Sequence, residues 1–494
     1  MHIVTTSSQK PVIPIVPVEA TRSRTGRPTA EAGPTGRSLY EKHKKIYPRS
    51  VKGWFANWRW VMVFVTQLVF YGLPWLRWND RQAVLFDLGA RRFFIFDLVL
   101  YPQDFIYLSA LLIISAYGLF FFTAIGGRLW CGYACPQTVY TEIFLWVERR
   151  FEGERGAHQK RDAGDWTVGK VARKVGKHAA WLTIAWWTGF TFVGYFTPIH
   201  TLWGEAFTLS FGPWEWFWVN FYGFATYGNA GFMREQVCKY MCPYARFQSA
   251  MYDRDTMTIT YDAARGDPRG VRARNADAKS LNLGDCIDCG LCVQVCPTGI
   301  DIRDGSQYEC TGCTACIDAC NGVMDKMHYP RQLIRYATLN GVAKGWSRRE
   351  MFARVLRPRI LIYGTVLLAL STTFVVSLTS RPLLRVDVVR DRTALARVVD
   401  DGSIENLYRL QLMNASEQPR EYRIAVDGVA GAAIVDGLPT ALGPSEARWV
   451  TVSVRVPAAT ANALSAGVHP IRFLIAQNDA SRPVIERSSF IVPR

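Results

Sequence analysis

The sequence is short of histidine and lacks several familiar cofactor motifs. Its 494 residues include seven histidines. No two of them lie at facing positions within two apolar segments, so a membrane b-type haem has no evident ligands. No glycine-rich nucleotide-binding motif stands out. The amino terminus also lacks a basic stretch followed directly by an apolar run. We therefore expect no cleaved secretory signal, and we expect the first apolar segment to act as an uncleaved anchor.

The net charge of +17 does not come from one basic surface. Lys and Arg crowd the ends of apolar runs, as the positive-inside rule predicts for membrane proteins, rather than interleaving with aromatic residues as in nucleic-acid-binding surfaces. Hydrophobic residues make up 49% of the chain and include 17 Trp and 27 Phe. This composition indicates membrane spans combined with polar domains. We expect membrane lipid, and no nucleic acid, as a partner.

Five segments reach the length needed to cross a bilayer, for which roughly 17–25 apolar residues are required. They are about 60–76, 105–125, 179–199, 213–233 and 360–380. The second, third and fifth contain no charged residue. Glycines in and around the fourth segment predict close helix packing: Gly223, Gly228 and Gly231. The chain is therefore expected to contain a five-helix transmembrane region.

The distribution of Lys and Arg orients these spans. Residues 37–59 carry seven of them, 128–178 carry ten and 344–359 carry six, whereas 200–212 carry none. With the basic sides inside, the amino terminus and the segment between the fourth and fifth spans lie in the cytosol. The carboxyl terminus then lies outside, which is the periplasm if the membrane is the inner membrane of a Gram-negative cell.

The spans divide the chain into five expected regions. They are a disordered cytosolic tail (1–50), the first four spans (51–245), a cytosolic domain (246–345), a basic linker with the fifth span (346–383) and a domain outside the membrane (384–494). In the last region Val450, Val452, Val454 and Val456 alternate with polar residues. Such alternation predicts an immunoglobulin-like β-sandwich. The region lacks cysteine, so no disulfide joins its sheets, and Asn414-Ala-Ser416 is interpreted as a turn.

Eight of the twelve cysteines form two matching tetrads between residues 286 and 320. Each run has the spacing C-x2-C-x2-C-x3-C, by which bacterial ferredoxins hold [4Fe–4S] clusters, and the fourth cysteine of each run binds the other cluster. We assign Cys286, Cys289, Cys292 and Cys320 to the first cluster, and Cys310, Cys313, Cys316 and Cys296 to the second. A zinc knuckle does not need eight cysteines in two tetrads, and cytosolic thiols stay reduced, which argues against disulfides. The domain is expected to be ferredoxin-like, with two clusters.

The remaining four cysteines form two C-x3-C-P motifs, and we call them the edge thiols: Cys131, Cys135, Cys238 and Cys242. The motifs follow the second and fourth spans, so both lie at the cytosolic membrane edge. In a helix, residues i and i+4 share one face, and two such faces could bring four sulfurs together.

Three interpretations of the edge thiols compete. They form a soft-metal site for Cu(I), Zn or another iron–sulfur cluster, a thiol/disulfide pair that takes electrons from the clusters, or small packing residues at helix ends. Repetition at equivalent positions favours a function without choosing between metal and dithiol. Three methionines near the second motif could add thioether ligands: Met233, Met241 and Met251.

Together, the tetrads, the paired C-x3-C-P motifs, the five spans and the terminal β-sandwich resemble the CcoG/RdxA/FixG family, accessory proteins for assembly of cbb3-type cytochrome c oxidase. The resemblance covers about residues 40–494. It implies a membrane-bound cupric reductase that converts Cu(II) to Cu(I) in the cytosol, with copper held by the edge thiols. It also implies oxidase assembly factors or copper chaperones as partners. We further expect an electron donor that the sequence does not identify, and a second copy of the chain in a homodimer.

Two other functions remain open from the sequence. The first is a ferredoxin-type membrane carrier that passes electrons between redox partners without copper specificity. The second is a scaffold whose β-sandwich recruits oxidase subunits.

Overall fold

The computed structural model describes residues 45–493, except 275, 277–279, 392–395, 436–438 and 478–482. The chain separates into the units Met1–Lys45 and Ile46–Arg494, and all structure described below belongs to the second. Most of the expected amino-terminal tail lies outside the described residues. In its last part, the Tyr47 hydroxyl donates to Asp162 at 2.8 Å and the Arg49 backbone N–H donates to the Gln294 carbonyl at 2.8 Å. These contacts hold residues 46–50 on the folded part.

The amino-terminal half is helical apart from a strand-rich segment between α1 and α2. Its helices are α1 (Trp54–Gly72), α2 (Phe105–Gly126), α3 (Leu129–Tyr133), α4 (Pro136–Glu152), α5 (Arg155–Ala163), α6 (Val168–Val193), α7 (Ile199–Thr208), α8 (Pro213–Gly228) and α9 (Pro243–Met251). Short 3₁₀ turns are η1 (Leu73–Trp75) and η2 (Pro102–Asp104), and π-helical segments are η3 (Asn229–Met233) and η4 (Val237–Met241). The short strands are β1 (Arg77–Trp78), β2 (Arg81–Gln82), β3 (Val84–Asp87), β4 (Arg92–Ile95) and β5 (Leu98–Leu100).

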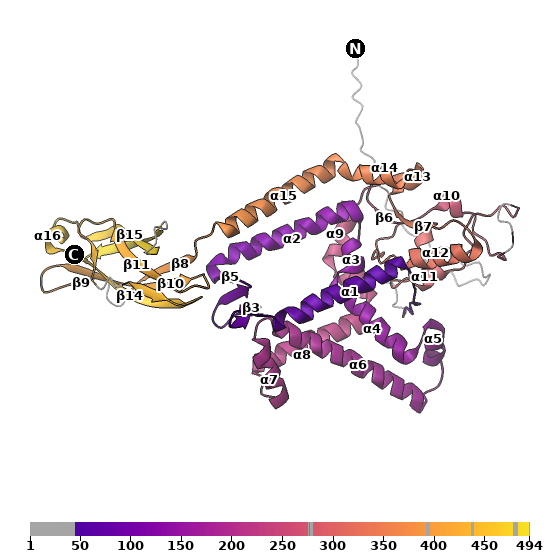
Figure 1. Ribbon diagram of the computed structural model, residues 1–494, viewed down its shortest axis with the longest axis horizontal. Coiled ribbons are helices and arrows are strands. Elements are labelled where there is room, and N and C mark those ends of the chain that lie inside the picture. The colour runs from indigo at the N-terminus through magenta and orange to yellow at the C-terminus, as the bar shows by residue number, and fades with distance from the viewer. Residues whose placement is uncertain are drawn as a thin grey trace, which may run out of the picture. The chain divides into compact units, whose positions relative to one another are not determined.

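Two helices of the described residues are long and apolar enough to cross a membrane, Pro102–Gly126 and α15 (Pro358–Thr379). They lie side by side in Figure 1 and run in opposite directions. Tyr107 near the start of α2 contacts Phe374 near the end of α15, with ring centroids 6.1 Å apart. Tyr117, further along α2, meets Tyr363 of α15 at 6.0 Å.

The other three expected spans are helical, but among the described residues their helices are not both long enough and apolar enough to count as membrane spans. The fourth corresponds to α8, which has 16 residues before the backbone changes to π-helix. The third corresponds to α6, which begins at Val168, earlier than the expected 179. Thr167 caps the start of α6 because its side chain accepts from the Lys170 N–H. The first half of α6 is therefore basic, and only its second half is apolar. A region of five membrane helices therefore stays a prediction.

Close packing between α6 and α8 depends on glycine. A methyl group on Gly189 would overlap the carbonyl of Val219, and one on Gly223 would lie 3.5 Å from the carbonyl oxygen of Ala185. A methyl on Gly231 would lie 3.3 Å from the Trp181 ring, whereas Gly228 has nothing within 4 Å. The packing prediction is thus correct for Gly223 and Gly231 and wrong for Gly228. Gly189 was not predicted.

The two cysteine tetrads lie in a small α/β region after α9. Its elements are β6 (Thr258–Tyr261), α10 (Ala263–Gly266), α11 (Leu291–Gln294), η5 (Ile302–Asp304), α12 (Ala315–Met327), β7 (Ile334–Ala337), α13 (Leu339–Ala343), α14 (Arg348–Ala353) and η6 (Arg354–Leu356). Strands β6 and β7 pair antiparallel. Buried Ile259, Ile317 and Met324 form the core beside the cysteines.

Residues 384–493 form a β-sandwich, as the alternation predicts. Its strands are β8 (Leu384–Arg390), β9 (Arg397–Val398), β10 (Ile404–Asn414), β11 (Arg420–Asp427), β12 (Ala433–Ile434), β13 (Thr440–Leu442), β14 (Ala447–Val456), β15 (Gly467–Gln477) and β16 (Val484–Val492), with α16 (Ala458–Ala461) between β14 and β15. One sheet has the order β12-β14-β10-β8 with β9 beside β10, and the other has the order β13-β11-β15-β16.

The inward faces of the two sheets make one apolar core. Val452, Val454 and Phe473 are buried at the alternating positions, which confirms the strand prediction. Asn414 is also buried, and its side-chain amide donates to the carbonyls of Gln418 and Gly443 at 2.8 and 2.9 Å. Both amide hydrogens are used inside the fold. Asn414 is the last residue of β10 rather than a turn residue, and its side-chain oxygen accepts from the Ser416 N–H at 3.1 Å in the segment that follows.

Candidate functional site

The four cysteines assigned to the first cluster line one small cavity: Cys286, Cys289, Cys292 and Cys320. Cys286 and Cys292 are buried, whereas Cys289 is exposed. Much of the remaining wall is apolar and includes Val323 and Leu333. Because Cys289 reaches the surface, a protein that donates electrons can approach this cavity closely.

The four cysteines assigned to the second cluster line a small neighbouring cavity: Cys296, Cys310, Cys313 and Cys316. Cys292 lines both cavities. Cys296 belongs to the first run but faces the second cavity, and Cys320 belongs to the second run but faces the first. The structure thus brings together the groups of four that the spacing predicts, while their role as cluster ligands stays a prediction.

The two cysteine loops have the same backbone conformation. The residue two places after the first cysteine is left-handed in both, with φ of 51° at Asp288 and 73° at Gly312. The residue after the second cysteine is also left-handed, with φ of 64° at Gly290 and 60° at Thr314. Glycine adopts this conformation freely, but threonine does so at a cost. The Thr314 hydroxyl donates to the Cys313 carbonyl at 2.6 Å and bonds the Tyr133 hydroxyl at 2.7 Å, which holds the strained residue in place.

The donor set of each cavity fits a [4Fe–4S] cluster. Each offers four sulfurs in a mainly apolar surrounding, and backbone N–H groups point at them, from Gly312 to Cys310 and from Val293 to Cys292. Burial raises the pKa of the Cys292 thiol to about 11 and that of Cys310 to about 12. Free thiols would therefore stay protonated at neutral pH, and binding of iron would release their protons.

Each edge-thiol motif is a helical turn followed by a new helix. Cys131 lies within α3 and Cys238 within η4. Cys135 and Cys242 are the N-caps of α4 and α9, each followed by proline at the first helical position. The two cysteines of a pair are thus not on one continuous helix, because proline starts a helix but cannot continue one.

Backbone and side-chain donors point at the edge thiols. The Cys135 sulfur accepts from the backbone N–H groups of Gln137 and Thr138 at the start of α4, where the helix dipole also favours a thiolate. The Gln248 side chain donates to the Cys131 sulfur at 3.4 Å. Burial is nevertheless the larger effect and raises the pKa of Cys131 to about 11 and of Cys238 to about 12. A bound cation is needed to keep these sulfurs ionised.

The first C-x3-C-P motif packs directly on the loop of the second tetrad. A methyl group on Gly132, between Cys131 and Cys135, would lie 2.5 Å from the carbonyl oxygen of Gly312. A methyl on Gly312 would in turn lie 2.8 Å from the carbonyl oxygen of Arg128. Only glycine permits this backbone contact on both sides. The loop that carries Cys310 and Cys313 is thus in direct contact with the first C-x3-C-P motif.

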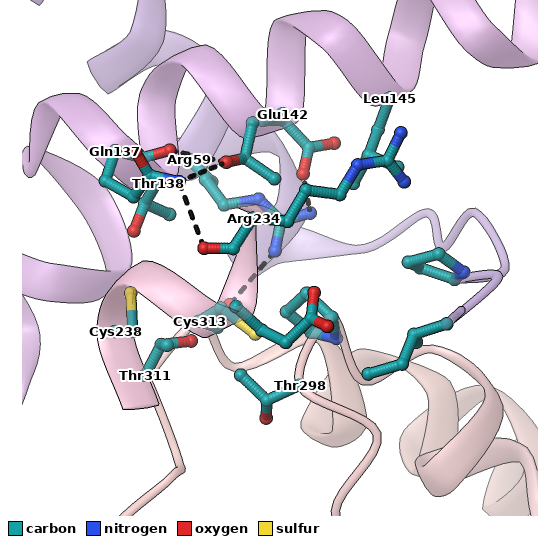
Figure 2. A pocket seen from close by; sticks show the side chains of 15 residues that line it. Arg59, Gln137, Thr138, Glu142, Leu145, Arg234, Cys238, Thr298, Thr311 and Cys313 are labelled. Atoms are coloured by element: carbon teal, nitrogen blue, oxygen red, sulfur yellow. Dashed lines mark hydrogen bonds and ion pairs between the residues drawn. The ribbon is translucent and has the colours of Figure 1, made fainter. Parts of the chain in front are cut away.

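A small cavity is lined by Cys313 of the second tetrad and by the edge thiol Cys238 (Figure 2). Cys238 and Thr311 lie near each other in this view, and Arg59 lies between Glu142 and the backbone of Cys313. The Arg59 guanidinium donates to the Cys313 carbonyl at 3.2 Å and pairs with Glu142 at 3.6 Å. In the described part of the chain, Cys238 is the edge thiol that lines this cavity.

The chain is similar to curated proteins over most of its length. It is 38% identical to nitrogen fixation protein FixG of Rhizobium meliloti, with 89% of this chain and 91% of FixG aligned. It is 41% identical to RdxA and 40% identical to RdxB of Cereibacter sphaeroides, with 80% of this chain aligned in each case and 84% and 85% of the relatives covered. The chain belongs to the FixG/RdxA family.

Family models place 4Fe–4S-binding domains on both cysteine regions of this FixG/RdxA protein. A 4Fe-4S dicluster domain matches residues 233–339, a 4Fe-4S binding domain matches 108–153, and the IG-like fold at the C-terminus of FixG matches 374–493. The FixG/RdxA chain is thus an iron–sulfur protein with an immunoglobulin-like carboxyl-terminal domain. A solved FixG-related protein from Vibrio parahaemolyticus covers 22% of this chain at 22% identity with a TM-score of 0.20, too low to support a fold assignment.

Several residues of the site were not found from the sequence of this FixG/RdxA protein. Arg59 and Tyr133 contact the second cysteine loop from α1 and α3, far away in sequence. The sequence could have indicated Arg59, because it is a charged residue inside the apolar run of α1. By contrast, the exposed Met233 and Met241 and the half-buried Met251 give no sign of contacting the edge thiols.

Proposed function

We propose that this protein is a membrane-bound oxidoreductase that reduces Cu(II) to Cu(I) at the edge thiols, in support of oxidase assembly. The observation that carries the proposal is the backbone contact between Gly132 and Gly312, which joins a four-thiol set to the loop of a predicted cluster. The eight tetrad cysteines would hold two [4Fe–4S] clusters, each of which supplies one electron at a time. Cu(II) needs one electron, and thiolates prefer the reduced ion.

The chain's own residues would bind and retain the copper substrate. Cu(II) accepts oxygen as well as sulfur ligands, and Glu142 and Glu235 line the same cavity as Cys238. The charge of Arg234 in the same wall is balanced by Glu148 at 2.8 Å. Reduction adds one electron to copper without making or breaking a covalent bond. A low-potential one-electron donor would then restore the oxidised protein.

We infer that α1, α6 and α8 lie in the membrane beside α2 and α15. Large apolar side chains on α1 and α8 support this arrangement, since Phe64, Leu68 and Phe224 are 67%, 75% and 65% exposed. Exposure of so large an apolar surface is unfavourable in water and favourable in lipid. Because Lys and Arg favour the cytosolic side of a membrane, we expect the cysteine region in the cytosol and the β-sandwich in the periplasm. A periplasm-specific reporter that is active after residue 345 and silent after residue 493 would contradict this topology.

Cu(I) formation by the purified protein tests the function. The protein is reduced anaerobically, freed of excess reductant and mixed with Cu(II) and a Cu(I)-specific chelator. We expect about two Cu(I) per chain, one for each [4Fe–4S] cluster, with parallel loss of the reduced-cluster signal. Heat-denatured protein and buffer alone are the controls.

The main alternative is a carrier that passes electrons to a protein partner without copper specificity. Its support is the exposed Cys289 at the first cavity, which suits electron exchange with a protein. The same assay separates the two functions. If reduced clusters stay reduced in the presence of Cu(II) but are oxidised by a redox protein, the carrier function holds and the reductase proposal fails.

A further inference from the structure

Helix α1 is anchored on the helix that carries two tetrad cysteines. Asp318 lies in α12 between Cys316 and Cys320, and its carboxylate accepts from the backbone N–H of Ala56 at 2.8 Å and from that of Phe55 at 3.4 Å. A carboxylate at a helix N-terminus satisfies free N–H groups and matches the helix dipole. No room exists for a side chain at Gly53, because a methyl would overlap Asp318. The start of α1 is thus fixed against the helix that carries Cys316 of the second site and Cys320 of the first.

This anchoring places a buried cation at the second cysteine loop. Arg59 lies just over one turn into α1, is 8% exposed, and donates to the carbonyl of Cys313 at 3.2 Å. Its ion pair with Glu142 is long, at 3.6 Å, and Glu142 also pairs with Arg149 at 3.4 Å. Its Nε–H has no hydrogen-bond partner among the described residues. The charge of Arg59 is therefore only partly neutralised, in a place where solvent screens it weakly.

We propose that Arg59 is a positioning residue that raises the reduction potential of the second cluster site, the one lined by Cys296, Cys310, Cys313 and Cys316. The inference rests on the proposed redox function. Reduction adds a negative charge to the cysteine cage, and a nearby buried guanidinium stabilises that charge. Charge and hydrogen bonding around the cysteines are the means by which a protein tunes such a site. Arginine suits the task because it does not lose its proton.

The first site has its own arginine, which provides an internal comparison. Arg272 donates to the carbonyl of Cys286 at 3.4 Å, as Arg59 does to Cys313. Arg272 comes from the loop before the first cysteine run and also donates to the Tyr329 hydroxyl at 3.1 Å. Arg303 also lines the first cavity, but Arg59 and Arg272 donate to the loops of different sites. Substitution of either one should therefore affect mainly its own site.

Redox titration of the full-length protein, followed by electron paramagnetic resonance, tests the proposal. Arg59→Gln should lower the equilibrium constant for reduction of the second site on the order of tenfold, which is about 59 mV for one electron. Arg59→Lys should keep most of the wild-type potential because it keeps the charge. Arg272→Gln should shift the first site alone, and Arg331→Gln, which removes an exposed side chain paired with Asp325, should shift neither.

A variant that is expected to raise the reduction potential separates an electrostatic role of Arg59 from a merely structural one. Glu142→Gln removes the counter-charge of Arg59 and should raise the potential of the second site, whereas loss of packing would not predict a rise. This variant also keeps the proposal testable if Arg59→Gln does not fold. An unchanged second potential in folded Arg59→Gln, an equal shift in Arg59→Lys, or a fall in Glu142→Gln would overturn the inference. Absence of Cu(II) reduction by the wild type would instead refute the proposed function and leave these potentials interpretable.

Discussion

Replacing all four edge thiols by alanine should abolish Cu(II) reduction while both iron–sulfur clusters remain. The expected loss of rate is at least about 100-fold, because even residues that only support metal ligands are worth about 10–100-fold. The tetrads have their own cavities and do not share a cysteine with the edge thiols. Cluster absorbance and iron content should therefore match the wild type. Cu(I) formation is measured with the chelator after removal of free reductant.

Methionine variants supply the matched control for this experiment. Met241→Ala removes a soft sulfur that lies between Cys238 and Cys242 in sequence but is 55% exposed. It should leave the rate of Cu(I) formation unchanged. If the protein without edge thiols reduced Cu(II) as fast as the wild type, copper would not be bound there, and the four cysteines would need another explanation.

The fourth cysteine of each cluster comes from the other cysteine run, and removing it is the second change with a large expected effect. Cys296→Ala should remove the cluster of the second run, and Cys320→Ala should remove that of the first, because each fourth cysteine faces the other run's cavity. Each variant should lose about four of eight irons, the content of one [4Fe–4S] cluster.

Paired single-site variants show which cluster is lost. Cys296→Ala should give the same residual resonance spectrum as Cys313→Ala, and Cys320→Ala the same as Cys286→Ala. Cys242→Ala, outside both tetrads, should keep about eight irons. If Cys296→Ala instead resembled Cys286→Ala, each run would hold its own cluster and the crossed assignment would be wrong.

Short sequence patterns predicted the strand β14 and the grouping of the tetrad cysteines. Alternating valines gave the strand β14 because side chains on a strand point to opposite faces. The tetrad spacing led to the same groups of four that line the two cavities. The family followed from the combination of motifs, and the aligned relatives confirm it.

Contacts between distant segments could not be predicted in this way. The meeting of Gly132 with Gly312, and of Arg59 with Cys313, joins residues about 180 and 254 positions apart, and no periodicity signals such pairs. The left-handed Thr314 also ran against local preference, since a β-branched residue rarely adopts positive φ and is held here by Tyr133. The function of the edge thiols stayed open because thiolates serve copper, zinc and iron–sulfur clusters alike.

Metal analysis of the anaerobically purified protein tests the account most directly. Two clusters on eight cysteines predict about eight iron and eight sulfide per chain, with copper retained by the edge thiols after exposure to Cu(I). About twelve irons would show that the edge thiols hold a third cluster rather than copper, and an iron-free protein would contradict the redox function altogether.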